Sequence, residues 1–139
     1  MRAKDIMTRD VKTIDADSCL WAAARLMRNH RIGFLPVMNG KRVIGVITDR
    51  DIVVRGLCEL KDPHFVTVSE IMTRDLIFCR EDDVLTDAAT RLAAHRIRRL
   101  LVLDREGGMA GLLSLDDLAA HLSSDRLLSS VVRDITARA

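Results

Sequence analysis

Apolar residues recur at positions i, i+3, i+4 and i+7 in two stretches of the chain, a spacing that places them on one face of an α-helix. The two stripes are Leu20, Ala23, Ala24, Met27 and Leu85, Ala88, Ala89, Leu92. Asp17-Ser18 and Asp82-Asp83 precede the stripes, and His30-Arg31 and His95-Arg96 follow them. Acidic or hydroxyl residues are typical of helix starts, and cations are typical of helix ends. The pattern predicts one helix in each stretch, with structural roles for both histidines.

Short β-prone runs flank these two helices and predict strands. The runs are residues 11–14, 34–38, 76–79 and 100–103. Asn39-Gly40 predicts a hairpin that leads into a further strand ending at Thr48, and residues 104–108 predict its counterpart. Pro36 predicts a strand at a sheet edge, or a position where its nitrogen faces no partner.

Two more apolar segments, residues 52–57 and 118–122, predict the second helix of each half of the chain. The element order is then β-α-β-β-α, twice, with a connector around residues 61–64. A last stripe at helical spacing predicts a C-terminal helix, and it consists of Leu128, Val131, Val132 and Ile135.

The chain is a tandem repeat. Ile-Met-Thr-Arg-Asp at residues 6–10 returns 65 residues later at 71–75, and Gly-Val-Ile-Thr-Asp-Arg-Asp at 45–51 returns as Gly-Leu-Leu-Ser-Leu-Asp-Asp at 111–117. We expect a first repeat over residues 1–63, a second over 64–122 and a C-terminal helical segment over 123–139. Duplicated units usually stack to complete a core that neither closes alone.

Each repeat contains a corner where a strand runs into a helix. A hydroxyl residue (Thr48, Ser114) stands at the expected N-cap, and a carboxylate (Asp51, Asp117) follows three residues later. This spacing predicts a capping box. Because a helix N-terminus exposes unpaired N–H groups, the same corner also suits a phosphate, and the two roles are compatible.

Composition narrows the function classes. The net charge is +2 and aromatic residues make up 3% of the chain, which argues against a nucleic-acid binder. No apolar run approaches the roughly 18 residues of a membrane span, and the N-terminus lacks a signal-peptide core, so we expect a cytoplasmic protein without a membrane partner. Cys19, Cys58 and Cys79 match no metal-binding spacing and predict reduced, mostly packed thiols. This spacing leads us to expect no metal. The sequence offers no nucleophile with a matching base, so we also expect no enzyme.

The repeat resembles the CBS domain, named for cystathionine β-synthase. The resemblance rests on the Ile-Met-Thr opening, the Leu-Pro-Val of the second strand and the Gly-x-x-Thr-x-x-Asp-Ile corner, and it covers residues 3 to about 122. Two such repeats in tandem resemble a Bateman module of the stand-alone bacterial type. This implies an α/β (α+β) fold of two β-α-β-β-α repeats related by a pseudo-two-fold axis, plus the C-terminal helix.

The resemblance implies binding of an adenosine-containing ligand in clefts between the repeats: AMP, ADP, ATP, NAD or S-adenosylmethionine. In similar proteins the corner hydroxyl approaches phosphate or ribose, and the Asp accepts hydrogen bonds from the ribose diol. Each cleft is closed by the opening segment of the other repeat. The implied nucleotide-binding residues are Thr48, Arg50, Asp51, Gly33, Phe34, Thr73 and Ile77 for the first cleft, and Ser114, Asp117, Arg98, Arg99, Thr8 and Lys12 for the second.

The two clefts are expected to differ. Arg50 supplies a cation for phosphate in the first, and Gly33-Phe34 offers an apolar surface for the base. In the second, Asp116 replaces Arg50, while Arg98-Arg99 supplies two guanidinium groups. A solvated strand end is the plain alternative for these two arginines.

The sequence thus predicts a ligand-sensing regulatory protein that signals to an unidentified client protein. The alternative is an assembly module without ligand. We also expect a homodimer, because the helices and the C-terminal stripe present more apolar surface than two stacked repeats consume. The competing possibility is that the C-terminal helix folds back over its own chain.

Overall fold

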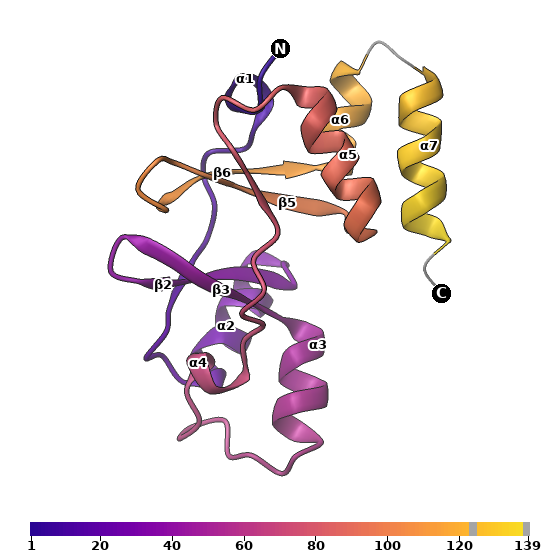
Figure 1. Ribbon diagram of the computed structural model, residues 1–139. Helices are drawn as coiled ribbons and strands as arrows, with labels where there is room; N and C mark the ends of the chain where they lie inside the picture. The colour runs from indigo at the N-terminus through magenta and orange to yellow at the C-terminus, as the bar shows by residue number, and fades with distance from the viewer. Residues whose placement is uncertain (123–124, 138–139) are drawn as a thin grey trace. The chain divides into compact units, whose positions relative to one another are not determined.

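The computed structural model describes residues 1–122 and 125–137. The chain forms two compact units, and neither follows the repeat boundaries. The central unit consists of residues 12–76, and the terminal unit combines residues 1–11 with the chain from residue 77 onward (Figure 1). The opening segment of each repeat is therefore built into the unit formed by the body of the other repeat.

The central unit is a three-stranded sheet in the order β1-β2-β3, with β1 parallel and β3 antiparallel to β2. The sheet carries two main helices, and one short helix lies in the opening segment of the second repeat. Its elements are β1 (Ile14–Asp15), α2 (Leu20–His30), β2 (Phe34–Asn39), β3 (Arg42–Thr48), α3 (Asp49–Asp51), the π-helical η1 (Ile52–Leu57) and α4 (Val68–Ile71). The predicted element order and the Asn39-Gly40 hairpin are confirmed, with Gly40 at φ +61°.

The terminal unit repeats this topology in the order β4-β5-β6 and adds a C-terminal helix. Its elements are α1 (Ala3–Ile6), β4 (Phe78–Arg80), α5 (Leu85–His95), β5 (Arg99–Leu103), β6 (Met109–Ser114), α6 (Leu115–His121) and α7 (Asp125–Thr136). The mixed α+β fold is confirmed. Within the described ranges, none of the helices is long and apolar enough to cross a membrane.

The starts of the two main helices differ from the prediction. The side chains of Asp17-Ser18 and Asp82-Asp83 do not cap them, because Cys19 and Val84 are the N-cap residues and neither makes a side-chain cap bond. Backbone carbonyls do this work: the Leu20 N–H donates to the Val66 oxygen (3.0 Å), and the Leu85 N–H donates to the Met1 oxygen (3.1 Å). Both carbonyls come from the opening segments, which thus satisfy helix ends that would otherwise be orphaned.

We call residues 1–8 and 66–73 the crossing segments. Each also fills the core of the unit it joins. Val68, Ile71 and Met72 are buried among the apolar residues of the central unit, and Ala3 and Met7 are buried at equivalent positions in the terminal unit. Each core is therefore completed by residues supplied from the opening of the other repeat.

Pro36 does not lie on an edge strand, because β2 is the middle strand of its sheet. The second possibility in the prediction holds instead. The pairing of β1 with β2 begins at Val37, one residue beyond Pro36, so β1 does not reach the proline. On its other side Pro36 lies opposite Val46, whose N–H donates to Thr73 rather than across the sheet.

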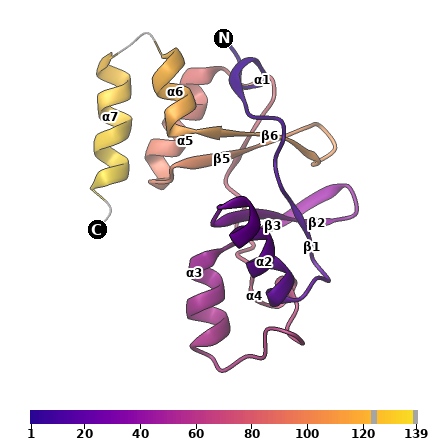
Figure 2. The same cartoon turned by 180° about the vertical axis from the view of Figure 1, so that it is seen from behind.

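The C-terminal helix α7 lies against α5 in both views of the terminal unit (Figures 1 and 2). Val131 and Ile135 of its apolar stripe are buried in the core of this unit. The stripe therefore has a partner within its own chain, and it cannot serve as the argument for a dimer. In the central unit, by contrast, Trp21, Val53 and Leu57 remain exposed.

The three cysteines are free, as the sequence predicted, but they differ in burial. Cys79 is buried, and that burial, reinforced by the charge of Asp83, raises the pKa of its thiol to about 11. Cys58 is exposed, so the expectation of mostly packed thiols is wrong for this residue.

Two neighbouring valines of α7 test its docking on α5. Val131 is 1% exposed and Val132 is 38% exposed. We expect Val131→Ala to lower the free energy of unfolding by about 2 kcal/mol, because two buried methyl groups are lost and a cavity remains. Val132→Ala should change it by less than about 0.5 kcal/mol. Urea denaturation measures both, and equal effects would contradict the docking.

Candidate functional site

The corner of the central unit joins β3 to α3. The Thr48 hydroxyl accepts a hydrogen bond from the Asp51 N–H (3.1 Å), and the Asp51 carboxylate accepts one from the Thr48 N–H (3.1 Å). The predicted capping box is therefore present, and it fixes the orientation of both side chains. The Asp51 carboxylate is thus held at the junction by the backbone N–H of Thr48.

The corner of the terminal unit, between β6 and α6, has the same geometry. The Ser114 hydroxyl accepts from the Asp117 N–H (3.0 Å), and the Asp117 carboxylate accepts from the Ser114 N–H (2.9 Å). The chain thus carries two copies of one construction, a hydroxyl and a carboxylate fixed where a strand becomes a helix.

A crossing segment passes directly beside each corner. Thr73 exchanges two backbone hydrogen bonds with Val46 (2.8 and 2.9 Å), and Thr8 exchanges two with Leu112 (both 2.9 Å). The glycine of each corner motif explains this closeness. A Cβ atom on Gly45 would lie 2.8 Å from the Thr73 carbonyl oxygen, and one on Gly111 would lie 2.9 Å from that of Thr8. Glycine within a strand commonly marks such an approach of another backbone.

The residues at the start of β2 lie beside the central corner, and those at the start of β5 lie beside the terminal corner. The Gly33 carbonyl accepts from the Asp49 N–H (3.0 Å), and the Arg98 carbonyl accepts from the Leu115 N–H (2.9 Å). Phe34 lies opposite Thr48 in the sheet. In the terminal unit, Arg99 is paired with Ser114 in the same register.

Most of the residues predicted for the site are thus brought together within one unit or the other. The central unit gathers Thr48, Arg50, Asp51, Gly33, Phe34 and Thr73, and the terminal unit gathers Ser114, Asp117, Arg98, Arg99 and Thr8. Ile77 belongs to the terminal unit, although it was predicted for the central corner, and Lys12 belongs to the central unit, although it was predicted for the terminal corner. Their role, and the nucleotide-binding role of the whole set, stay predictions.

Sequence reasoning missed one side chain of the central corner. Arg55, one turn after Asp51, places Nη1 4.0 Å from the Asp51 carboxylate and donates to the Met72 carbonyl oxygen (3.2 Å). An Asp followed four residues later by Arg was a visible signal for such a pair. Arg55 lies in the π-helical η1, where the Cys58 N–H donates to the Val53 oxygen at 2.9 Å. Single π-helical turns occur often at functional sites.

A hollow of about 380 Å³ lies beside the central corner. Thr73 and Arg55 line it and also contact Asp51, whereas Thr48 and Asp51 are not among its lining residues. The remaining lining residues are Ser69, Glu70, Met72, Arg74 and Asp75. Glu70 is occupied elsewhere: hydrogen bonds from Thr67 hold the pKa of its carboxyl below the usual range.

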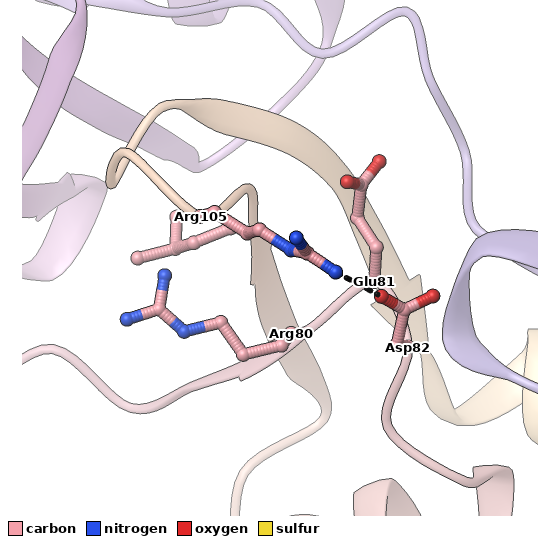
Figure 3. Close-up of a pocket in the computed structure, with 5 residues that line it drawn as sticks. Arg80, Glu81, Asp82 and Arg105 are labelled. Atoms are coloured by element: carbon pink, nitrogen blue, oxygen red, sulfur yellow. Dashed lines mark ion pairs between the residues drawn. The ribbon is translucent and has the colours of Figure 1, made fainter.

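A second hollow, of about 330 Å³, lies in the terminal unit (Figure 3). Its lining carries two basic residues, Arg80 and Arg105, and two acidic ones, Glu81 and Asp82, and Arg105 lies 3.9 Å from the Asp82 carboxylate. Asp82 also accepts a hydrogen bond from Lys4 (2.9 Å), and this bond, together with the charge of Lys4, holds the pKa of that carboxyl below its usual range. Leu103, at the hairpin end of β5, completes the lining, so this hollow lies away from the corner at Ser114.

The part of the chain that the structure describes holds no cluster of three His, Cys, Asp or Glu side chains able to bind a metal ion.

The family model of the CBS domain matches residues 3–56 and 68–124. One similar protein is the CBS domain-containing protein YhcV of Bacillus subtilis, which is 34% identical over 133 residues covering 96% of this chain and 94% of that protein. Another is Hypoxic response protein 1 of Mycobacterium tuberculosis, 32% identical over 130 residues covering 93% of this chain and 90% of that protein.

Solved structures show the same likeness. Hypoxic Response Protein I, with two coordinated zinc ions, matches with a TM-score of 0.80 at 32% identity over 88% of this chain and 99% of that one. The CBS domain pair of protein MJ0100, in complex with 5′-methylthioadenosine and S-adenosyl-L-methionine, matches with a TM-score of 0.73 at 26% identity. The match covers 86% of this chain and 94% of that one. CBSX2 in complex with AMP matches with a TM-score of 0.74 at 25% identity, and the match covers 86% of this chain and 93% of that one.

The close approach at the corner glycines makes a direct prediction. Gly45→Ala should lower the free energy of unfolding by about 1 to 3 kcal/mol, because the added methyl group meets a backbone oxygen that no side-chain rotation can move. Gly111→Ala should act in the same direction, since the geometry is repeated. Urea denaturation of both variants checks this, and an unchanged midpoint would show that the crossing segment does not lie against the glycine.

Proposed function

The chain belongs to the CBS domain family, and on that premise we propose that it is a regulatory protein that binds an adenosine-containing ligand at its two corners. The observation that carries the proposal is the duplicated pair of hydroxyl and carboxylate, Thr48 with Asp51 and Ser114 with Asp117, each fixed by a capping box. The ligand class is AMP, ADP, ATP, NAD or S-adenosylmethionine.

The chemistry of the corner supports a ribose. An ionised carboxylate accepts hydrogen bonds at both oxygens, and a vicinal diol offers two donors at matching separation. Phe34 and the neighbouring strand end provide apolar surface for a base in the central unit. Arg98 and Arg99 offer cationic groups for phosphate beside the terminal corner.

The solved relatives support the ligand class. Two of the CBS proteins described above carry 5′-methylthioadenosine, S-adenosyl-L-methionine or AMP. All three ligands contain an adenosine ribose. We propose that this shared group is what the corner carboxylates read, and that the protein passes ligand occupancy to a client protein without catalysing a reaction.

We further propose a homodimer formed through the central unit. Trp21, Val53, Val54 and Leu57 are large apolar residues that remain exposed on α2 and η1. In the terminal unit α7 already lies on α5, and Ala119 and Ala120 replace the two valines. The exposed apolar surface that supports self-association is therefore concentrated on the central unit.

Ligand binding should stabilise the fold. At about a hundred times its dissociation constant, a ligand adds about 2.7 kcal/mol, which raises the melting temperature of a domain of this size by about 10 °C. A thermal-shift series with AMP, ADP, ATP, NAD and S-adenosylmethionine measures this. The shift should disappear in the double variant Asp51→Asn/Asp117→Asn, and 2′-deoxy-AMP should give a smaller shift than AMP because it lacks one hydroxyl.

Asp87→Asn is the matched control. Asp87 occupies the same third position of a helix, in α5, but lies outside both corners, so its variant should keep the full ligand shift. If none of the five ligands moves the midpoint of the wild-type protein, the assembly module without ligand is the better description.

The dimer has its own test. Sedimentation equilibrium at micromolar concentration should give a dimeric mass for the wild-type protein and a monomeric mass for Val53→Asp, because a buried unpaired carboxylate is costly. Ala119→Asp, the same change at the equivalent position of the terminal unit, should leave the dimer intact. A monomeric wild-type protein would contradict the proposal.

A further inference from the structure

The Asp51 carboxylate is already engaged within its own unit. Besides the Thr48 N–H, it receives the Thr73 hydroxyl, whose oxygen lies 3.3 Å from each of the two carboxylate oxygens. A hydroxyl placed between both oxygens occupies the fork that a ribose diol needs. The Asp51 side chain is only 13% exposed.

This Thr73 hydroxyl is held in place by the backbone. The two hydrogen bonds between Thr73 and Val46 fix its main chain against β3. Arg55 adds a further restraint, because its guanidinium reaches the Met72 carbonyl oxygen (3.2 Å) and lies near Asp51 (4.0 Å).

The backbone N–H groups of the same corner are also engaged. The Arg50 N–H donates to the side chain of Asp49 (2.8 Å), and the Asp49 carboxylate lies against Gly33, where a Cβ would be 2.5 Å from its oxygen. Asp49 thus occupies the N–H group that a phosphate would use and adds a negative charge beside it.

The terminal corner lacks these engagements. Thr8 makes the same backbone pair, with Leu112, yet among the side chains that the structure describes, those of residues 1–122 and 128–137, none donates to the Asp117 carboxylate, which accepts from the Ser114 N–H. His121 stands in place of Arg55 and places Nδ1 3.0 Å from the Asp117 backbone oxygen, not its carboxylate.

The backbone N–H groups also differ between the corners, because those of the terminal corner are less engaged. Leu115 stands in place of Asp49 and has no side-chain acceptor. Among the described residues, the Asp116 N–H has no hydrogen-bond partner, whereas its counterpart, the Arg50 N–H, is bonded to Asp49.

We propose that the central corner is masked by its own chain, through Thr73 and Asp49, and that the terminal corner at Asp117 is the first to bind the ribose of an adenosine ligand. The central corner fills only at higher ligand concentration, after Thr73 is displaced from Asp51. This inference rests on the proposed function and adds an order of occupancy to it. Two corners of unequal affinity let one chain respond over two ranges of ligand concentration.

Calorimetric titration of the full chain with AMP tests the mask. The wild-type protein should give two binding phases. Thr73→Val keeps the backbone and shape but removes the hydroxyl, so the weaker phase should tighten by about three- to tenfold, the range expected for one hydrogen bond. Thr8→Val, the same change at the equivalent position, should tighten neither phase.

The role of Asp49 is separated by two variants. Asp49→Ala frees the Arg50 N–H and removes the charge, whereas Asp49→Asn removes the charge but keeps an acceptor. Asp49→Ala should tighten the weaker phase more than Asp49→Asn does, by about threefold for one hydrogen bond. Equal tightening would mean that only the charge of Asp49 matters, and it would overturn the part of the mask that rests on its hydrogen bond with the Arg50 N–H.

The site assignment is read from single variants. Asp117→Asn should remove the tighter phase, and Asp51→Asn should remove the weaker one. The reverse assignment, or a Thr73→Val variant in which the weaker phase weakens or stays unchanged, overturns the proposal, since Thr73 would then be a ligand contact or a bystander. If AMP does not bind, the same titration is made with whichever of the five ligands gives the largest thermal shift. A wild-type chain that binds none of the five contradicts the proposed function itself, and the mask falls with it.

Discussion

The close contact between a crossing segment and a corner glycine is the constraint on which the rest of the structure depends. Gly45 and Gly111 lack the Cβ atom that would collide with the carbonyl oxygen of Thr73 or Thr8, so a second backbone can bond directly to the last strand of each sheet. Once that segment is in place, its apolar residues complete the core and its carbonyl groups satisfy the start of the main helix. The same contact carries Thr73 to Asp51. Core, helix ends and site are therefore consequences of one approach of two backbones.

Because the two repeats share this construction, their differences can be compared position by position. The replacement of Leu115 by Asp49, and of His121 by Arg55, leaves the capping box intact and changes only what else the corner holds. The helical surfaces have diverged in a parallel way, since α7 lies against α5 while the apolar surface of η1 stays exposed. In both cases one copy is engaged within the chain, and we propose that the other is the copy used by a partner or ligand.

The sequence predicted those features whose cause is local. Helical spacing located α2 and α5, and the pairing of Thr48 with Asp51 predicted a capping box because its atoms are only three residues apart. The exchange of crossing segments was expected only from the family resemblance, since residues 6–10 and 71–75 have the same sequence and would suit either unit equally well. The approach of the Asp49 carboxylate to Gly33 likewise depends on the pairing of β2 with β3, which brings together residues far apart in the sequence. The stripe on α7 indicated apolar surface without indicating what it would contact.

If the two corners bind the same ligand with unequal affinity, amide chemical shifts follow both corners in one titration. In a ¹⁵N-labelled full-length chain titrated with AMP, we expect the amides of Ser114 to Asp117 to shift first and to approach saturation before those of Thr48 to Asp51 begin to move. The Asp116 amide should respond strongly, because its N–H has no partner among the described residues. Shifts that develop together at both corners, or first at Thr48 to Asp51, would contradict the masking of the central corner.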